Sequence, residues 1–517
     1  MSKQIFAFGG ESHYSPENTM VAYWAALGSG ADGIEVPVQL TKDKKLVCSR
    51  YPTLSKTCGD KRAVSNLTIA DVRSLDAGLK FRSSELDELN QPTGTVGADT
   101  PWDGKSQRSV FHPELKDVLL ELSRRTNFLI RIDCGKSSKA SQRELAKLLV
   151  EELSKFGLLN AAIIGGSKSD LEQVRENSKK AVLALVVDTK ETIAASVKKA
   201  KSLKASYAIV LAEKVLTAKG RPRKGVSQAF GKSLKAIVCS ETMSPALTPS
   251  MIESCQGIAW VSGFLCPAVR DCADSLKGSS IIFEEHFQGK EIDERYWRVG
   301  YSKPNKDTKI WQDDGLHIKI RQGGEYSGAA ALTAFSIRGD FDAQLDFVVT
   351  NPMQGTTFEL AAIEVDPGYH HPKNTDLSRR NTNLTFDVHG APPYASSERD
   401  ENDGFRIGWN NGPAVTQFVK HQSQSSNIYN KYSRDVGDGS PENNEGKLRL
   451  VRCGSVFNAY YTDGNNSYWV LAGTANVPTL CDEVFLRIGA KHWPKRGKTP
   501  PKNSFQFNNF KIFQPAI

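Results

Sequence analysis

Two stretches near the N-terminus decide the fold: FAFGGESHYSPENT at residues 6–19 and GADGIEVPVQLTKD at residues 30–43. The first starts with a short apolar run that stops at Gly9-Gly10, and the second carries the next such run. Further apolar runs recur about every 20 to 30 residues, with helical apolar spacing between them. These later runs are residues 128–132, 161–164, 181–187, 207–211, 236–239 and 257–261. Strand and helix alternating about eight times predicts a parallel (β/α)8 barrel of the TIM type over residues 1–278.

After Ser279 the helical spacing ends. Segments such as 316–320, 341–347, 447–451 and 505–513 alternate apolar and polar residues. A period of two with Gly, Asn and Asp turns predicts antiparallel strands, packed as a jelly-roll β-sandwich over residues 279–517. Residues 463–466, Asp-Gly-Asn-Asn, predict a hairpin turn. The polar stretches Pro367–Pro393 and His421–Asn444 predict long loops, where binding usually resides.

Length and composition limit the number of domains and the class of protein. The chain has 517 residues, with 67 Lys+Arg against 58 Asp+Glu, which gives a formal net charge of +9. This length predicts two to four domains, and the apolar content excludes a mainly disordered chain. We expect no signal peptide and no membrane span, because no apolar run approaches the roughly 18 residues that a span needs.

The nine cysteines are scattered and form no CxxC pair. Reduced thiols in a chain made in a cytoplasm are the simplest interpretation, and a late-exported or virion-assembled protein would look the same.

Positive charge gathers between Lys136 and Lys235, where lysine and arginine strongly outnumber the acidic residues. Nucleic-acid binding would need aromatic residues among these charges, and the segment has almost none, so we expect no nucleic-acid partner. Two interpretations stay open: solvated faces of helices, or a surface for an anionic partner.

Motifs in the first 80 residues carry a family resemblance. The two opening stretches are followed by Pro52-Thr53-Leu54, Leu67-Thr68-Ile69 and Leu75-Asp76-Ala77-Gly78. Together they resemble the glycerophosphodiester phosphodiesterase family, which typically reads His-Arg-Gly, then Pro-Glu-Asn-Thr, then Gly-Ala-Asp-x-Ile-Glu-x-Asp. The resemblance is specific to about residue 80, and the barrel spacing continues to about residue 270. It implies a metal-dependent phosphodiesterase site at the mouth of the barrel.

That chemistry needs a divalent metal held by carboxylates and two histidines that transfer protons. At the matching positions stand Phe8 and Gly9 for the first His-Arg, Glu35 and Pro37 for the Glu-x-Asp metal pair, Arg50 for the second histidine, and Arg131 for a later metal-binding glutamate. Phenylalanine and proline neither transfer protons nor bind metals, and a guanidinium with a pKa above about 12 is no general base at neutral pH. We therefore expect a vestigial barrel site, with no catalytic residues, no metal and no cofactor.

The replacements suggest a new pairing. Arg50 and Arg131 should lie at the carboxyl ends of barrel strands near Glu35, where arginine charge would replace metal charge. Two outcomes stay open: an ion pair that neutralises the buried glutamate, or a site for an anion such as phosphate. His13, five residues past the first histidine position, is either a catalytic substitute or a loop histidine without a chemical role.

The second half resembles the concanavalin A-like, or laminin-G-like, sandwich domains. The motifs are residues 283–287 with 295–299, 447–461, 485–489 and 507–512. Members of this superfamily bind glycans or proteins, and some cleave polysaccharides. The closest approach to a Glu-x-Asp-x-x-Glu cleavage motif is residues 364–369, which lacks the second glutamate and contains a proline.

Sugar binding needs an aromatic platform beside amides and carboxylates. The candidates are Trp409 and Asn410 after Asp403, and Trp493. Each tryptophan has a second interpretation as a packing residue of the sandwich. His370-His371 near Asp366 is a further pair, but adjacent histidines seldom converge on one metal ion.

The sequence thus predicts a non-catalytic structural or recognition protein. A disarmed phosphodiesterase-like barrel would carry a glycan- or protein-binding sandwich, as a homo-oligomer or as a surface component of a virion or other large assembly. The alternative is a phosphoric diester hydrolase that acts on glycerophosphodiesters or phospholipid head groups through a reorganised site with Ca²⁺ or Mg²⁺.

Overall fold

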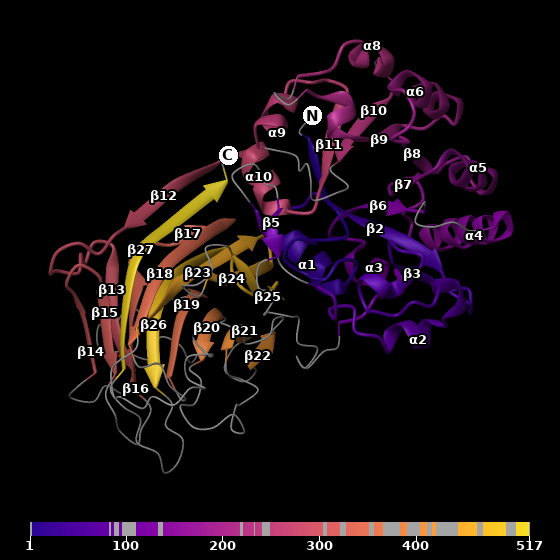
Figure 1. Cartoon of the computed structure of the whole chain (residues 1–517). Coiled ribbons are helices and arrows are strands. Elements are labelled where there is room, and N and C mark those ends of the chain that lie inside the picture. Colours follow the sequence, from indigo (N-terminus) through magenta and orange to yellow (C-terminus); the bar gives the residue numbers. More distant parts are fainter. Residues whose placement is uncertain are drawn as a thin grey trace. The chain divides into compact units, whose positions relative to one another are not determined.

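The computed structural model divides the chain into two compact units, Met1–Gly278 and Ser279–Ile517 (Figure 1). The structure describes residues 3–81, 84–86, 92–95, 110–132, 138–217, 221–231, 233–239, 249–302, 308–320, 327–350, 356–364, 383–389, 404–410, 416–419, 443–462, 469–492 and 503–515. Each unit is described by itself.

The N-terminal unit is built on a closed barrel of eight parallel strands. Along the barrel wall the strands follow the order β1-β11-β10-β9-β8-β7-β6-β2, and β1 closes it by pairing with β2 as well. The barrel strands are β1 (Gln4–Ala7), β2 (Gly33–Leu40), β6 (Asn127–Arg131), β7 (Ile163–Gly166), β8 (Val182–Val186), β9 (Tyr207–Leu211), β10 (Lys235–Cys239) and β11 (Val261–Cys266). A short strand, β3 (Leu46–Cys48), pairs antiparallel with the end of β2, outside the barrel. The predicted (β/α)8 barrel is confirmed.

Helices connect the strands and lie on the outer side of the barrel, as α4, α5 and α6 show in Figure 1. Several begin at a Ser or Thr whose side chain accepts a backbone N–H of the first turn, for example Thr19, Ser138 and Thr192. The helices are α1 (Met20–Gly28), α2 (Ile69–Arg73), α3 (Leu115–Leu122), α4 (Lys139–Lys155), α5 (Lys168–Asn177), α6 (Ile193–Ser202), α7 (Ala212–Val215), α8 (Val226–Phe230), α9 (Pro249–Cys255) and α10 (Val269–Lys277), with two 3-10 turns, Leu54–Lys56 and Val64–Asn66, and a two-stranded sheet of β4 (Ser84–Leu86) and β5 (Pro92–Thr95).

An apolar layer fills the barrel interior. Its buried members come from seven strands and are Phe6, Leu129, Ile163, Ala184, Ile209, Ile237, Cys239 and Leu265. Phe8, just after β1, packs against this layer. Residues two apart on a strand share a face, so Arg131, two residues after Leu129 on β6, also belongs to the interior side. The next level toward the carboxyl ends of the strands therefore carries the residues of the candidate site.

The C-terminal unit consists of two antiparallel sheets. One has the order β14-β15-β27-β18-β23-β24-β25 with β12 beside β27, and the other has the order β13-β16-β26-β19-β20-β21-β22 with β17 beside β26. The strands are β12 (Ser279–Glu285), β13 (Trp297–Ser302), β14 (Lys309–Gln312), β15 (Leu316–Ile320), β16 (Ser327–Thr333), β17 (Ile337–Arg338), β18 (Phe341–Thr350), β19 (Thr356–Ile363), β20 (Asn383–His389), β21 (Gly404–Asn410), β22 (Thr416–Val419), β23 (Asn443–Cys453), β24 (Val456–Thr462), β25 (Val470–Asn476), β26 (Glu483–His492) and β27 (Asn503–Pro515).

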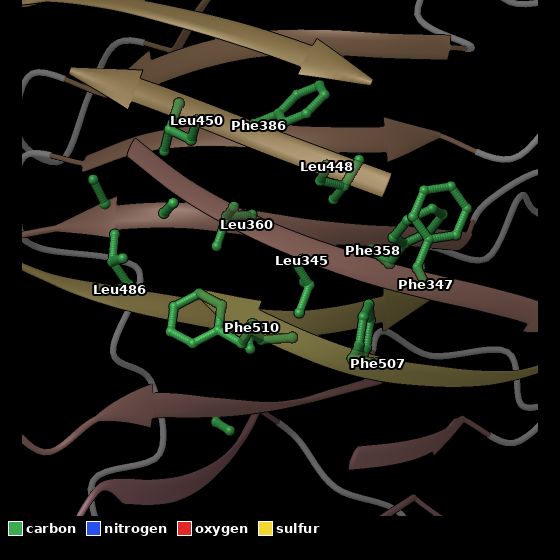
Figure 2. Close-up of a cluster of buried hydrophobic side chains, with 14 of the residues drawn as sticks. Leu345, Phe347, Phe358, Leu360, Phe386, Leu448, Leu450, Leu486, Phe507 and Phe510 are labelled. Atoms are coloured by element: carbon green, nitrogen blue, oxygen red, sulfur yellow. The ribbon is translucent and has the colours of Figure 1, made fainter. Parts of the chain in front are cut away.

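Alternating residues of both sheets form one core, as in a sandwich. Figure 2 shows Leu345 and Phe347 of β18 together with Phe358 and Leu360 of β19, all buried. In β18 the residues between these core positions face away from the core, and this alternation is what predicted the strand.

Two boundaries differ from the sequence prediction. The last barrel strand begins at Val261 instead of Gly257, because residues 257–260 form a turn. The predicted loop Pro367–Pro393 contains β20, since Leu384 and Phe386 supply buried core positions that the polar neighbours concealed. Strands β24 and β25, on either side of the predicted hairpin turn, pair in antiparallel register. The turn residues 463–466 and most of the predicted loop His421–Asn444 lie outside the described residues. None of the described helices is long and apolar enough to cross a bilayer.

Candidate functional site

The candidate site is centred on Glu35, the third residue of β2, whose side chain is fully buried. The backbone N–H of Gly9 donates to Glu35 Oε2 over 2.9 Å. Arg50 Nη2 also pairs with Oε2, and Arg131 Nη1 lies 3.4 Å from Oε1. A carboxylate without water is costly unless it is paired and hydrogen-bonded, and here one backbone donor and two guanidinium groups meet that need.

Arg131 is the last residue of β6 and pairs in register with Pro37 of β2. Its side chain is 5% exposed. A Cβ atom on Gly165 of β7 would lie 2.9 Å from Arg131 Cδ. Because Gly165 has no side chain, the aliphatic part of the Arg131 side chain fits against β7 in the barrel interior.

Arg50 reaches the site from a different place than predicted. It follows β3, the antiparallel strand outside the barrel, and does not end a barrel strand. Its guanidinium lies 3.7 Å from the centre of the Phe8 ring, in cation–π geometry. Its Nε is also 3.6 Å from Glu17 Oε2. The structure therefore brings all six residues of the predicted vestigial site into one cluster.

The loop that carries Gly9 is fixed from both sides. Asn18 N–H donates to the carbonyl of Gly9 over 2.8 Å. Val269 N–H at the start of α10 donates to Glu11 Oε1 over 3.0 Å. Gly10 has a φ of +92°, and a Cβ there would lie 2.6 Å from Ala22, so this turn requires glycine. The N–H of Gly9 is held toward Glu35 by this framework.

The residues around Glu35 do not fit the divalent metal that the family resemblance implies. Both oxygens of the only retained carboxylate contact guanidinium groups, and a positively charged guanidinium competes directly with a cation for that place. The next residue of β2 on the same face as Glu35 is Pro37, whose side chain offers no ligand atom. Within the described ranges, no three His, Cys, Asp or Glu side chains gather as a metal ligand set.

Two buried histidines lie in the loops beside this cluster. His13 is 2% exposed, stands edge-on to Tyr14 with ring centres 4.5 Å apart, and has no hydrogen-bond partner at Nδ1. His112 is 1% exposed and contacts Thr57 Oγ1 through Nε2 at 2.9 Å and the Asn18 carbonyl through Nδ1 at 3.2 Å. Burial lowers the pKa of each imidazole to about 4, so both are neutral at neutral pH.

Three residues of this neighbourhood were not among the sequence candidates. Glu17 lies inside the quoted Pro-Glu-Asn-Thr motif, so the motif itself contained the signal for the partner of Arg50. Gly165 is recognisable only when the neighbouring strand is known to carry an arginine. His112, in Phe111-His112-Pro113, is far from the opening motifs in sequence and carries no spacing signal.

Most of the candidate binding residues of the sandwich lie outside the described part of the chain. Asp403, Trp493 and His370-His371 lie outside the described residues. The backbone of Trp409 and Asn410 lies in β21, where Trp409 pairs in register with the core residue Leu384. Glycan or protein binding by this unit stays a prediction.

A closed eight-stranded (β/α)8 barrel with a charged cluster at the carboxyl ends of its strands defines the N-terminal unit as a TIM-type barrel protein with its candidate site in the usual place. The "Glycerophosphoryl diester phosphodiesterase family" matches residues 9–231, and a "Protein of unknown function (DUF1583) C domain" matches residues 264–385.

Named relatives agree with the first match. The chain is 32% identical over 166 residues to a glycerophosphodiester phosphodiesterase of Caldanaerobacter subterraneus, covering 31% of this chain and 67% of the relative. It is 34% identical over 134 residues to one of Bacillus altitudinis, covering 26% of this chain and 46% of the relative. Through its N-terminal unit the chain belongs to the glycerophosphodiester phosphodiesterase family. The concanavalin-like assignment of the second unit stays a resemblance.

Solved structures are also similar. A phosphodiesterase from Oleispira antarctica, solved in complex with the product sn-glycerol-3-phosphate, is 16% identical with a TM-score of 0.41, over 53% of this chain and 96% of that one.

Glu35→Gln should destabilise the N-terminal unit by about 3 to 5 kcal/mol, because two largely buried guanidinium groups lose their shared counter-charge. The double change Glu35→Gln/Arg131→Met should cost clearly less than the two single changes added together, since the three groups act as one network. Urea denaturation monitored by hydrogen exchange, which reports each unit separately, measures these differences. The control is Lys168→Gln, in an exposed pair with Glu172 on α5, with an expected cost below about 1 kcal/mol. A Glu35→Gln cost as small as that of the control would contradict the network.

The stability of the N-terminal unit should fall as the pH drops from about 6.5 toward 4. In this window the unfolded chain protonates His13 and His112, whose folded pKa is about 4, so the unfolded state binds more protons. Each histidine contributes a slope of up to about 1.4 kcal/mol per pH unit. His13→Phe, which keeps a buried ring without a titrating nitrogen, should reduce the slope of unfolding free energy against pH between 5 and 6. An unchanged slope would refute the contribution of His13.

Proposed function

We propose that the N-terminal barrel binds phosphoric diesters of glycerol, such as glycerophosphodiesters or phospholipid head groups, at the carboxyl ends of its strands. The observation that carries the proposal is the clustering of Phe8, Gly9, Glu35, Arg50 and Arg131 at this mouth. All of them except Phe8 lie within residues 9–231, which match the family. The two arginines supply guanidinium groups, the donors that phosphate groups select.

Hydrolysis of the bound diester is the second candidate function, and the comparisons favour it over the non-catalytic expectation. The two relatives named above are both glycerophosphodiester phosphodiesterases. Since the chain spans 67% of the first relative and 46% of the second, their activity comes to this protein as a proposal.

The chemistry of the described site supports binding without metal-dependent hydrolysis. Hydrolysis needs a base for the attacking group, an acid for the leaving group and stabilisation of the developing charge. Phe8 and Arg50 stand where the family has its two histidines, and neither exchanges a proton at neutral pH. His13, with a pKa of about 4, is a weak base, and its ring is buried against Tyr14.

One assay separates the two candidates. The purified full chain is incubated with glycerophosphocholine and, separately, with a generic aryl phosphodiester, each with Ca²⁺, with Mg²⁺ and with EDTA. We expect no turnover above the level of Glu35→Ala under any condition. Metal-dependent turnover that Glu35→Ala abolishes would contradict the expectation of binding without hydrolysis and establish the hydrolase.

A gain-of-function variant serves as the positive control. Phe8→His, Pro37→Asp, Arg50→His and Arg131→Glu combined rebuild the family's residues at four positions. Turnover by this variant, together with silence of the wild type, would show that the assay detects the reaction when the site allows it.

A further inference from the structure

The outer face of the β14–β15 hairpin in the sandwich carries an exposed aromatic pair. Trp311 of β14 and His317 of β15 are register partners, and their rings are stacked, with centres 5.1 Å apart and planes 11° apart. Trp311 is 36% exposed. Ile310 and Ile318, at the alternate positions of the same two strands, are buried in the sandwich core, so Trp311 and His317 point away from it.

The second face of the Trp311 indole is open. The 5.1 Å between the ring centres is close to the spacing of paired strands, about 4.8 Å, so the rings stack along the direction that leads from β15 to β14. Strand β14 stands at the end of its sheet (Figure 1). One face of the indole therefore lies against His317, and the other looks outward from the edge strand. Among the described residues, no other aromatic ring or cation contacts Trp311.

The pair is held rigidly. Strand β15 pairs with β27 from Leu316 to Ile320, which anchors the hairpin in the sheet. The Nε2–H of His317 donates to the carbonyl of Asp313 over 2.9 Å, and this bond fixes the ring behind the indole. The platform is thus formed before any ligand arrives, which lowers the entropy cost of binding.

Two lysines lie beside the aromatic pair on the same face. Lys309 and Lys319 are register partners, two residues from Trp311 and His317 respectively. Like charges directly opposite each other destabilise a sheet. In the part of the chain that the structure describes, neither lysine side chain has a hydrogen-bond or ion-pair partner. An anionic group between the two ammonium groups would relieve their repulsion.

The hairpin turn places acidic residues at the opposite end. Asp313 and Asp314 are both exposed, and the carboxylate of Asp314 accepts the N–H of Gly289 over 3.1 Å. The surface therefore has a cationic end, an aromatic ring in the middle and an acidic end.

We propose that this surface binds an acidic sugar, with the apolar face of one sugar ring on the open face of Trp311 and a carboxylate or sulfate between Lys309 and Lys319. Ammonium groups form charge-assisted hydrogen bonds to such anions, and the carboxylate of Asp313 accepts hydrogen bonds from sugar hydroxyls. Packing of C–H groups on an indole requires an exposed flat ring, and this ring is exposed.

The charge pattern favours a sugar over a nucleic acid. A nucleic-acid strand carries a phosphate at every unit, so a strand stacked on Trp311 with one phosphate at the lysines would bring a further phosphate toward Asp313 and Asp314. A single ring between a cationic and an acidic end fits one stacked unit with one acidic group.

The test is isothermal titration calorimetry of the full chain with galacturonic acid hexasaccharide, a heparin hexasaccharide and neutral cellohexaose. We expect at least one acidic probe to bind about tenfold or more tightly than cellohexaose. Trp311→Ala should weaken that binding by about tenfold or more, because the stacking surface is lost. Tyr296→Ala removes an exposed aromatic residue outside the hairpin and should leave the affinity unchanged.

The lysines provide a test that misfolding cannot imitate. Lys309→Gln should weaken binding of the acidic probe while the thermal midpoint of the sandwich stays the same or rises, because a like-charge pair is removed. Lys447→Gln, at an exposed lysine of the same sheet paired with Asp346, should leave the affinity unchanged.

Each contrary outcome overturns the inference. These outcomes are no binding of either acidic probe, equal binding of cellohexaose, binding that Trp311→Ala does not alter, and tighter binding of a single-stranded DNA hexamer. Since the hairpin lies in the second unit, none of them bears on the function proposed for the barrel.

Discussion

A carboxylate that water does not reach must be neutralised where it stands, and in this protein that carboxylate is Glu35. Its side chain is fully buried at the carboxyl end of the barrel, with a backbone N–H from Gly9 and guanidinium groups from Arg50 and Arg131 around it. The other features of the mouth follow from this requirement. Gly165 leaves room for one arginine stem, Phe8 supports the second guanidinium, and Asn18 holds the loop from which Gly9 donates.

The same requirement links the charged cluster to the stability of the barrel. When a metal site loses ligands, the remaining carboxylate becomes a buried charge without a partner, which costs several kcal/mol. Arginines at positions 50 and 131 remove that cost by pairing with Glu35.

Much of this arrangement could be predicted from sequence, because alternation along a strand fixes the side on which a residue lies. Arg131 follows Leu129 by two positions, so the barrel pattern was enough to place it inside, near Glu35. The position of Arg50 after a short antiparallel strand could not be predicted, since three residues of β3 give no clear period. Gly165 and His112 depend on neighbours that only the folded barrel brings close.

In the sandwich too, the features that follow from sequence periodicity could be predicted, and those that depend on neighbours in the fold could not. Its strands were predictable wherever one face is apolar, as in β18 with Phe341, Leu345 and Phe347. Strand β20 was missed because its two buried core residues, Leu384 and Phe386, lie in a polar stretch that predicts a loop. The tryptophans proposed for glycan binding were chosen by composition alone, and composition does not separate a platform from a packing residue.

The most direct measurement of the central claim is anomalous diffraction from crystals of the full chain soaked in Mn²⁺, a divalent ion that binds carboxylate sites and scatters anomalously. The account predicts guanidinium density of Arg50 and Arg131 against Glu35 and no anomalous peak within coordination distance of its oxygens. An Mn²⁺ peak beside Glu35, with the arginines displaced, would contradict it.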